Sequence, residues 1–355
     1  MKLGGFLMPS HPPERAIGPA IEWDLAQIEQ LDRLGFDEVW IGEHFSAPWE
    51  PVPAPDLLIA QAIPRTSQIK LCPGAHLLPY HHPVELAHRV AQLDHMARGR
   101  YMLGIGISGL PSDLNLYAID PASGENRRMT IESLDIMLRL WRGEAFDFRG
   151  KYWNVGKPAS SFDFLKLHLR PYQNPHPPIG IAGLSAGSET LKIAGERAFM
   201  PLSLSLNDDH TASHWKSVEE GARRSGRTPS RKDWRIVRDI YIAPTDAEAK
   251  RRVREGMLGR VWRDYLLPFF TGSGMGPNLV RPGDPESALS VDYFIENAWL
   301  VGSPDTVVRK IQRLQQATGG FGTLLMMVYD YSNESAHLDE SLRLLTKEVM
   351  PHFAD

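Results

Sequence analysis

Short apolar segments alternate along the chain with longer segments in which apolar residues recur at helical spacing. Residues 2–8 form a short apolar segment that Pro9 ends, and this predicts a strand. Residues 19–34 repeat an apolar side chain every third or fourth position, which predicts a helix that ends at Gly35. Residues 38–42 follow as a second strand, which is too apolar to face water on either side.

The same alternation continues to the C-terminus. Further strands are expected at residues 69–75, 101–107, 179–184, 198–204, 234–243 and 323–328, each followed by a helix. Eight such units in 355 residues predict one α/β domain, residues 1–355, folded as a (β/α)₈ TIM barrel with insertions. A doubly wound sheet is the alternative. The turn after the first strand argues against it, because it is rich in proline and is no glycine loop for a dinucleotide.

Two segments interrupt this rhythm. Residues 143–177, after the fourth unit, carry aromatic residues and prolines and are expected to be an insertion with extended segments. Residues 258–300, after the seventh strand, have no clear period and place many aromatic residues among glycines. Because a long irregular loop is usually functional or disordered, we expect this segment to be a mobile active-site lid. Its apolar character favours a hydrophobic substrate.

Composition narrows the classes of partner. The net charge of −4 is mixed along the chain without a long basic run, so nucleic acid is not an expected partner. No apolar run approaches the roughly 20 residues of a membrane span, so no membrane association is expected. The single cysteine, Cys72, excludes an internal disulfide and is interpreted as a small core residue. A cytoplasmic protein is therefore predicted.

The main candidate for chemistry is the pair Glu43–His44, which directly follows the second strand. In a parallel α/β fold the carboxyl ends of the strands carry the active site, so His44 is predicted to be a catalytic residue. The alternative for His44 is a core histidine that hydrogen-bonds a neighbouring loop. Glu43 is either a group that orients its neighbours or a stabilising ion-pair partner, and we favour the second.

Residues 183–188 are the best candidate for a phosphate site. Here the fifth strand turns into a helix through two glycines and two serines, and exposed amides at a helix N-terminus favour an anion. The alternative, weighed equally, is an ordinary N-cap by Ser185. Arg127 and Arg128 are candidates for the accompanying cation, although paired arginines more often lie on a solvated helix face.

Two further patterns are not interpreted as cofactor motifs. Residues 104–109 match G-x-G-x-x-G, but Pro111 follows closely and the motif lies in the fourth unit, so a dinucleotide site is rejected. Close approach of a flat ring to this backbone is the version that we retain. His76, His81 and His82 lack the spacing and carboxylates of a zinc site, so no metal is expected. His76 is expected to line the pocket, and His82 to begin a helix.

Several motifs taken together resemble one known family. They are residues 35–44 (GFDEVWIGEH), 81–83 (HHP), 99–106 (GRYMLGIG), 182–185 (AGLS) and 301–307 (VGSPDTV). Each is loose alone, but their order along nearly the whole chain is similar to that of the bacterial-luciferase-like flavin monooxygenases. Within that family the chain most resembles the monooxygenases of terpenes and cyclic ketones, of the limonene and diketocamphane types.

The resemblance implies roles for individual residues. It makes His44 the catalytic histidine and places a non-prolyl cis peptide at Gly74–Ala75, under the flavin ring. The remaining implied FMN contacts are Ser108, Arg128, Ser185, Ala186, Gly187 and Ser188, and the implied substrate contacts are Met8, His76 and Trp299. Luciferases proper carry a reactive cysteine where this chain has Ile107, which argues against light emission.

The implied activity is that of a two-component monooxygenase. Enzymes of this kind take reduced FMN from a separate NAD(P)H-dependent flavin reductase and add O₂ to form a C4a-hydroperoxyflavin. The expected substrate is a hydrophobic cyclic ketone, terpene or aldehyde, and Baeyer–Villiger oxidation, hydroxylation and epoxidation all remain open. A homodimer is expected by analogy. The alternatives are hydride transfer with a deazaflavin on the same fold, and a non-catalytic flavin-binding protein.

Overall fold

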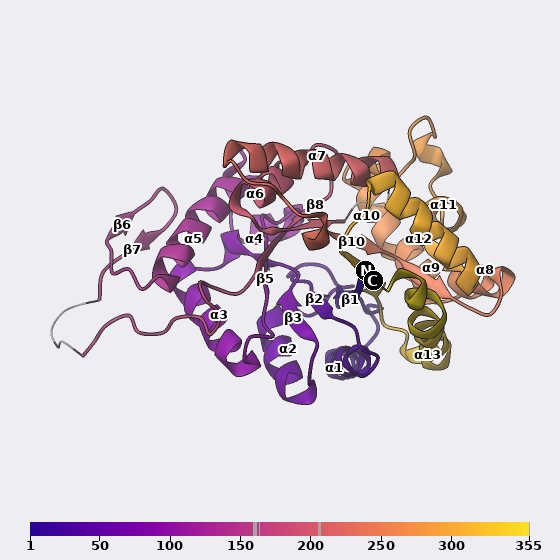
Figure 1. Cartoon of the computed structure of the whole chain (residues 1–355), viewed down its shortest axis with the longest axis horizontal. Helices are drawn as coiled ribbons and strands as arrows, with labels where there is room; N and C mark the ends of the chain where they lie inside the picture. The colour runs from indigo at the N-terminus through magenta and orange to yellow at the C-terminus, as the bar shows by residue number, and fades with distance from the viewer. Residues whose placement is uncertain (159–161, 163, 205–206, 355) are drawn as a thin grey trace.

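The computed structural model describes residues 1–158, 162, 164–204 and 207–354, and its centre is a parallel sheet that curls into a barrel (Figure 1). The sheet order is β3-β2-β1-β13-β10-β9-β8-β5-β4. The strands are β1 (Lys2–Leu7), β2 (Glu38–Ile41), β3 (Lys70–Pro73), β4 (His76–Leu77), β5 (Leu103–Gly106), β8 (Ile179–Gly183), β9 (Met200–Ser203), β10 (Arg235–Arg238) and β13 (Thr323–Val328). β3 and β4 are successive parts of one barrel strand, and a parallel bridge from Leu71 to Tyr101 continues the pairing toward β5. The predicted eight-stranded barrel is therefore confirmed.

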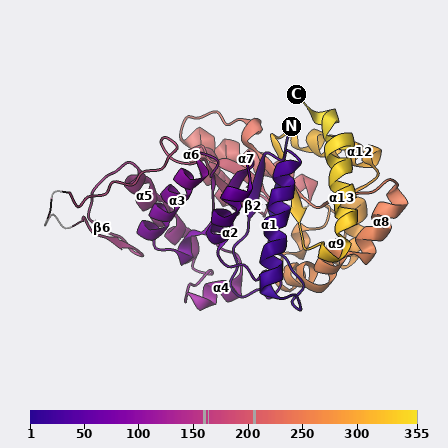
Figure 2. The ribbon, with the colours of Figure 1, turned by 90° about the horizontal axis from the view of Figure 1, so that it is seen from below.

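Helices surround the sheet, and Figure 2 shows α1, α2 and α3 along one side. The helices of the repeating units are α1 (Ile17–Arg33), α2 (Pro55–Ala62), α3 (Pro83–Ala97), α5 (Glu125–Trp141), α6 (Glu189–Arg197), α7 (Asp208–Arg224), α12 (Pro304–Thr318) and α13 (Ser335–Leu344). A short helix, α4 (Pro111–Leu116), lies between β5 and α5. The two termini lie together, where the amino group of Met1 donates to the Phe353 carbonyl at 2.5 Å.

The inside of the barrel is filled by Trp40 from β2. Its indole donates to Glu38 Oε1 at 2.9 Å, and Glu38 pairs with Arg235 through two contacts of 3.1 Å. A β-carbon on Gly180 would lie 2.5 Å from Trp40 Cη2, so small residues here make room for the indole. Cys72 is fully buried in the same inner cluster, which confirms its interpretation as a core residue.

The seventh strand differs from the expected single segment. It divides at Asp239 into β10 and β11 (Ile240–Ile242), and β11 pairs with β12 (Leu300–Gly302) in a separate parallel sheet. The chain between them is largely helical: α8 (Asp246–Glu255), α9 (Met257–Val261), a π turn (Trp262–Leu266), α10 (Leu267–Gly272), two 3-10 turns (Gly276–Asn278 and Glu286–Ala288) and α11 (Val291–Asn297).

The expectation of an irregular segment at residues 258–300 was therefore wrong. The helices are only five to seven residues long, and α10 has no buried residue, so no single apolar period runs through the segment. Trp262, Phe294 and Trp299 pack together in its interior. Whether the segment acts as a lid stays a prediction, and we call residues 258–300 the lid segment below.

The insertion at residues 143–177 carries a hairpin that projects away from the barrel (Figures 1 and 2). Its extended part is a hairpin of β6 (Phe148–Arg149) and β7 (Asn154–Val155), which confirms the expectation of extended structure. The Glu132 carboxylate on α5 accepts from the amides of residues 151–153 and so ties the hairpin to the body. Residues 159–161 and 163 lie outside the described part.

Candidate active site

His44 lies between two buried carboxylates, just beyond the carboxyl end of β2. Its Nδ1 is 3.0 Å from Asp113 Oδ2, and its Nε2 is 3.3 Å from Glu50 Oε2. The side chain of His44 is 22% exposed, whereas those of Glu50 and Asp113 are 5% and 0% exposed. The imidazole is therefore accessible to a small molecule, while the two groups that control its charge are not.

Asp113 is a fixed partner of this histidine. Its carboxylate also accepts from the amide of Phe45 at 3.2 Å, from the amide of Ser46 at 2.8 Å, and from the Ser46 hydroxyl. Burial raises the pKa of Asp113, but hydrogen bonds from His44 and Ser46 outweigh it and hold the pKa below its usual value. Asp113 therefore stays ionised and keeps a proton on Nδ1 of His44.

Glu50 is buried like Asp113 but has fewer hydrogen-bond partners among the described residues. Burial raises the pKa of Glu50, and the charge of His44 and the Tyr265 hydroxyl oppose that shift. Burial also lowers the pKa of His44, but the charges of Glu50 and Asp113 outweigh it, so the net effect raises this pKa. The site favours the imidazolium form of His44.

Glu43 points away from His44. Its carboxylate accepts from His76 Nδ1 at 2.9 Å and from His81 Nε2 at 2.8 Å, as expected for an ion-pair partner. The three groups lie close enough to share a cation, but the N–O distances are those of hydrogen bonds, so the absence of a metal stays a prediction. His76 Nε2 is buried and has no hydrogen-bond partner among the described residues.

The break between β3 and β4 is the cis peptide Gly74–Ala75, so the predicted cis geometry is confirmed. A β-carbon on Gly74 would lie 2.8 Å from Trp40 Cβ, which explains the glycine. Ser108 follows β5 with φ +61°, a rare value for serine, and its hydroxyl accepts from Tyr80 at 2.5 Å. Met8 lies beside Gly42 at the top of the inner cluster. Met8, His44, His76 and Ser108 thus share one rim of the barrel.

The loop between β8 and α6 differs from its expected form. α6 begins at Glu189, so Ser188 rather than Ser185 precedes its first turn, and the alternative of an N-cap by Ser185 was wrong. The Ser188 hydroxyl pairs with Thr190 Oγ1 at 2.9 Å. Residues 185–187 are exposed, and Gly187 has φ +64°, which favours glycine. The loop therefore presents its amides to solvent, as an anion site requires.

A buried histidine, His214, contacts the loop between β8 and α6. His214 Nε2 is 3.0 Å from the Ser185 carbonyl, and Nδ1 is 2.8 Å from the Ser203 hydroxyl. Burial lowers the pKa of His214 to about 4, so the ring is neutral at neutral pH. Because a carbonyl only accepts, the proton is on Nε2. Sequence reasoning missed this residue.

Two predicted site residues have other contacts in the structure. Arg128 donates from Nε to the Tyr152 hydroxyl at 2.9 Å and from Nη1 to the Ser123 carbonyl at 2.8 Å. Arg127 is exposed and makes no side-chain hydrogen bond within the described chain. Trp299 is 1% exposed and stacks on Phe294 at 5.2 Å. The roles of Arg128 at the phosphate and Trp299 at the substrate stay predictions.

Sequence reasoning also missed Asp113, Glu50 and Tyr265. Asp113 lies 69 residues after His44, and Tyr265 lies in the lid segment, so no local spacing joins them to the histidine. One feature of the sequence could have indicated Asp113. Pro111 follows the glycine motif of residues 104–109 and begins a short helix, and Asp113 lies in the first turn of that helix.

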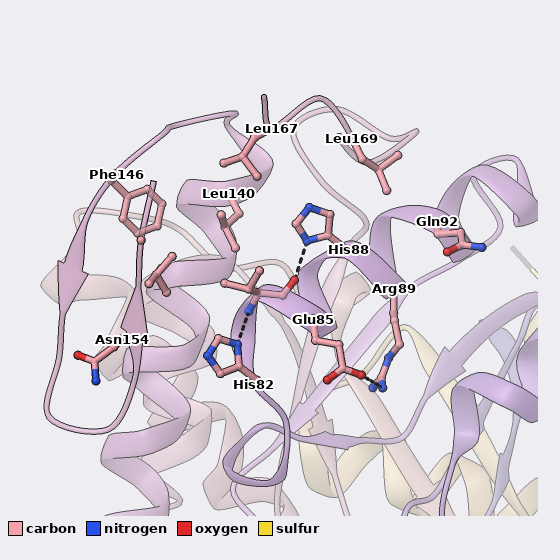
Figure 3. A pocket seen from close by; sticks show the side chains of 13 residues that line it. His82, Glu85, His88, Arg89, Gln92, Leu140, Phe146, Asn154, Leu167 and Leu169 are labelled. Carbon is pink, nitrogen blue, oxygen red and sulfur yellow. Dashed lines mark hydrogen bonds and ion pairs between the residues drawn. The ribbon is translucent and has the colours of Figure 1, made fainter. Parts of the chain in front are cut away.

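The structure also has an open groove of about 640 Å³ between α3 and the insertion hairpin (Figure 3). Its lining includes His82, Glu85, His88 and Arg89 on the α3 side and Phe146 on the insertion side. His82 accepts from the amide of Val84 at 3.3 Å and so caps α3, as expected. None of the predicted site residues lines the groove, and it lies apart from His44.

Taken together, the protein is a TIM barrel with a partly exposed histidine at the end of its second strand and an exposed loop before the helix that follows its fifth strand. A model of the luciferase-like monooxygenase family matches residues 1–320, and the chain belongs to this family. Within the described part, no helix is both long and apolar enough to cross a membrane.

Several relatives cover almost the entire chain. It is 36% identical to 3,6-diketocamphane 1,6-monooxygenase of Pseudomonas putida, over 99% of this chain and 98% of the relative. It is 35% identical to limonene 1,2-monooxygenase of Rhodococcus erythropolis, over 99% of this chain and 86% of the relative. The solved oxygenating constituent of 3,6-diketocamphane monooxygenase, in complex with FMN, superposes with a TM-score of 0.91 at 36% identity, covering 99% and 98% of the two chains. An F420-dependent secondary alcohol dehydrogenase shares the fold, with a TM-score of 0.73 at 18% identity.

Proposed function

We propose that this protein is the oxygenating component of a two-component, FMN-dependent monooxygenase that converts a hydrophobic cyclic ketone to a lactone. The observation that carries the proposal is His44, whose partly exposed imidazole lies just beyond the carboxyl end of β2 with Asp113 at Nδ1 and Glu50 at Nε2. The whole-length similarity to a type II Baeyer–Villiger monooxygenase supports the reaction class. Epoxidation is the second candidate, because limonene 1,2-monooxygenase is a relative of similar identity.

The residues present fit FMN. The exposed amides of residues 185–187 and the hydroxyl of Ser188 suit its phosphate, with Arg128 as the accompanying cation once its guanidinium leaves Tyr152. The small residues Gly74 and Ala75, with Ser108 beside them, suit a flat ring against the backbone. When bound, reduced FMN supplies the electrons that activate O₂ for transfer of one oxygen atom.

The side chains around the ring have distinct tasks. Asp113 keeps the proton on Nδ1 of His44, so Nε2 is the atom that can donate to a substrate carbonyl oxygen. That hydrogen bond orients the ketone and draws electron density from its carbonyl carbon. Met8, His76 and Trp299 are the proposed substrate contacts, and the aromatic lid segment would exclude water during oxygen transfer.

The proposed partners follow from the same class. A separate NAD(P)H-dependent flavin reductase supplies reduced FMN, in line with the description of the solved relative as an oxygenating constituent. A homodimer in the cytoplasm is the proposed assembly and location. Hydride transfer with a deazaflavin is less well supported, because the F420-dependent structures are at most 21% identical and show the fold alone.

The test supplies reduced FMN from an unrelated flavin reductase and offers a panel of bicyclic ketones, with limonene as a separate arm. The balanced reaction consumes ketone, O₂ and reduced FMN and yields lactone, water and oxidised FMN, so one ¹⁸O atom from labelled O₂ enters the lactone. We expect His44→Ala to lose product formation while it still binds FMN. The proposal is wrong if no ketone is oxygenated, and an epoxide from limonene alone would favour the second candidate.

A further inference from the structure

The two carboxylates that face His44 make contacts of different kinds. Asp113 is held by backbone amides as well as by His44 Nδ1, so it cannot leave without breaking several hydrogen bonds. Glu50 lies 3.3 Å from His44 Nε2, and its Oε2 accepts no hydrogen bond from the described residues although it is buried. Asp113 is thus the permanent partner of the imidazole, and Glu50 the partner that a ligand can replace.

Glu50 also contacts the lid segment. The ring of Tyr265 stacks on Trp49, the residue next to Glu50, at 5.9 Å with an interplanar angle of 3°, and its hydroxyl favours the ionised form of Glu50. Arg260 lies 5.6 Å from the same indole and pairs with Glu14 at 2.7 Å. The turn that carries Glu50 is therefore held between the histidine on one side and the lid segment on the other.

We propose that Glu50 and Tyr265 are positioning residues for His44: Glu50 keeps a proton on Nε2, and Tyr265 makes that contact depend on the seated lid segment. The inference rests on the proposed function, in which Nε2 donates to the substrate oxygen. A substrate oxygen that reaches Nε2 takes the place of Glu50, whose charge stays close enough to hold the proton on the ring. Asp113 keeps the second proton on Nδ1 throughout.

The charges around His44 predict the direction in which its pKa should change when Glu50 or Tyr265 is replaced. Glu50 and Asp113 face the two ring nitrogens of His44, and the charge of Glu43 acts on the ring although its carboxylate points away. Tyr265 acts on Glu50 from the lid segment. Loss of the Glu50 charge removes attraction for the imidazolium, so the pKa of His44 falls. Loss of the Tyr265 hydroxyl removes a polar group that favours ionised Glu50, so the pKa of His44 also falls, but by less.

The experiment follows the His44 ring by NMR during a pH titration of the full chain, with and without FMN, in Glu50→Gln, Tyr265→Phe and the double variant. Glu50→Gln should lower the pKa of His44 by about one unit or more. Tyr265→Phe should lower it by less, and the double variant should match Glu50→Gln because the tyrosine acts through the glutamate. The pH profile of ketone oxygenation should move in the same direction.

Tyr293→Phe is the matched control, because this tyrosine also lies in the lid segment but bonds Asp284 and the Arg281 amide. It should leave the pKa of His44 unchanged. An unchanged pKa in folded Glu50→Gln overturns the proposal, as does a double variant whose shifts simply add. If Glu50→Gln does not fold, the comparison of the His44 pKa in Tyr265→Phe and Tyr293→Phe decides. Equal values in these two variants would then overturn the proposal. Because the titration needs no turnover, failure of the oxygenation assay would contradict the proposed function and leave this result standing.

Discussion

Trp40 Cζ3 lies 2.9 Å from the position that a β-carbon would take on Gly104, and the Pro73 carbonyl oxygen lies 2.1 Å from it. The glycine at this position is therefore explained by packing inside the barrel. The sequence had suggested that a ligand ring approaches this backbone. At Gly104 the group that comes close is the protein's own indole together with a neighbouring strand.

Gly104→Ala should destabilise the protein by about 1–3 kcal/mol or more, because a backbone carbonyl cannot move aside as a flexible side chain can. The free energy of unfolding in urea measures the effect. Gly18→Ala is the control, since nothing lies within 4 Å of its added carbon. Equal stability of the two variants would contradict this packing argument.

Glu38→Gln should cost roughly 3–5 kcal/mol of stability, because it leaves the buried guanidinium of Arg235 without a full countercharge. The double variant Glu38→Leu/Arg235→Met should recover most of that loss, since replacing a buried ion pair by apolar groups is often neutral. Chemical denaturation of the three proteins gives the comparison. A double variant that is no more stable than Glu38→Gln would show that the pair is required as such.

His11 links stability to alkaline pH. It lies between Asp330, 2.7 Å from Nδ1, and Asp24, 3.1 Å from Nε2. Burial lowers the pKa of His11, but these two carboxylates outweigh it and raise the pKa to about 9 from its usual 6.5. A raised pKa means that the contribution is fully present below about pH 6.5 and is lost as the pH rises through about 9.

The free energy of unfolding should therefore fall by up to ~3 kcal/mol between neutral pH and pH ~10 through this group. Urea denaturation across this range measures the slope. His11→Gln should be less stable at neutral pH and should show a smaller slope, because it has no proton to lose. An unchanged slope in His11→Gln would assign the alkaline loss to other groups.

A negative charge in the loop after β8 should weaken FMN binding. Ser185→Asp places a carboxylate beside the exposed amides of residues 186–187, where it would repel the phosphate and raise the Kd for FMN by about 10-fold or more. Riboflavin lacks the phosphate, so its Kd should change little. Fluorescence titration with both flavins separates the two effects.

Ser225→Asp is the control for the added charge, since Ser225 is exposed at the end of α7. In the same titrations Arg128→Ala should weaken FMN more than riboflavin, with Arg127→Ala as its partner control. A larger loss in Arg127→Ala would move the phosphate contact to that residue. If Ser185→Asp weakened the binding of FMN and riboflavin equally, the phosphate would not lie at this loop.

The sequence by itself determined the order of the barrel. Apolar runs and helical spacing are local signals, so all eight barrel strands and the position of His44 at a strand end could be predicted from residues close together in the chain. The loop of residues 183–188 was a candidate anion site from its own glycines and serines, whereas the cis peptide at Gly74–Ala75 was predicted only through the resemblance to a family. The start of α6 was displaced by three residues, because helix ends depend on capping contacts that spacing does not reveal.

Only the tertiary structure decided what surrounds His44. Asp113 approaches His44, and Tyr265 acts on its partner Glu50, from elements far along the chain, and no periodicity encodes such contacts. The same holds for the lid segment, whose short helices become regular only when they pack on one another. The identity of the histidine was thus readable in the sequence, whereas its charge depends on carboxylates that folding brings to its two ring nitrogens.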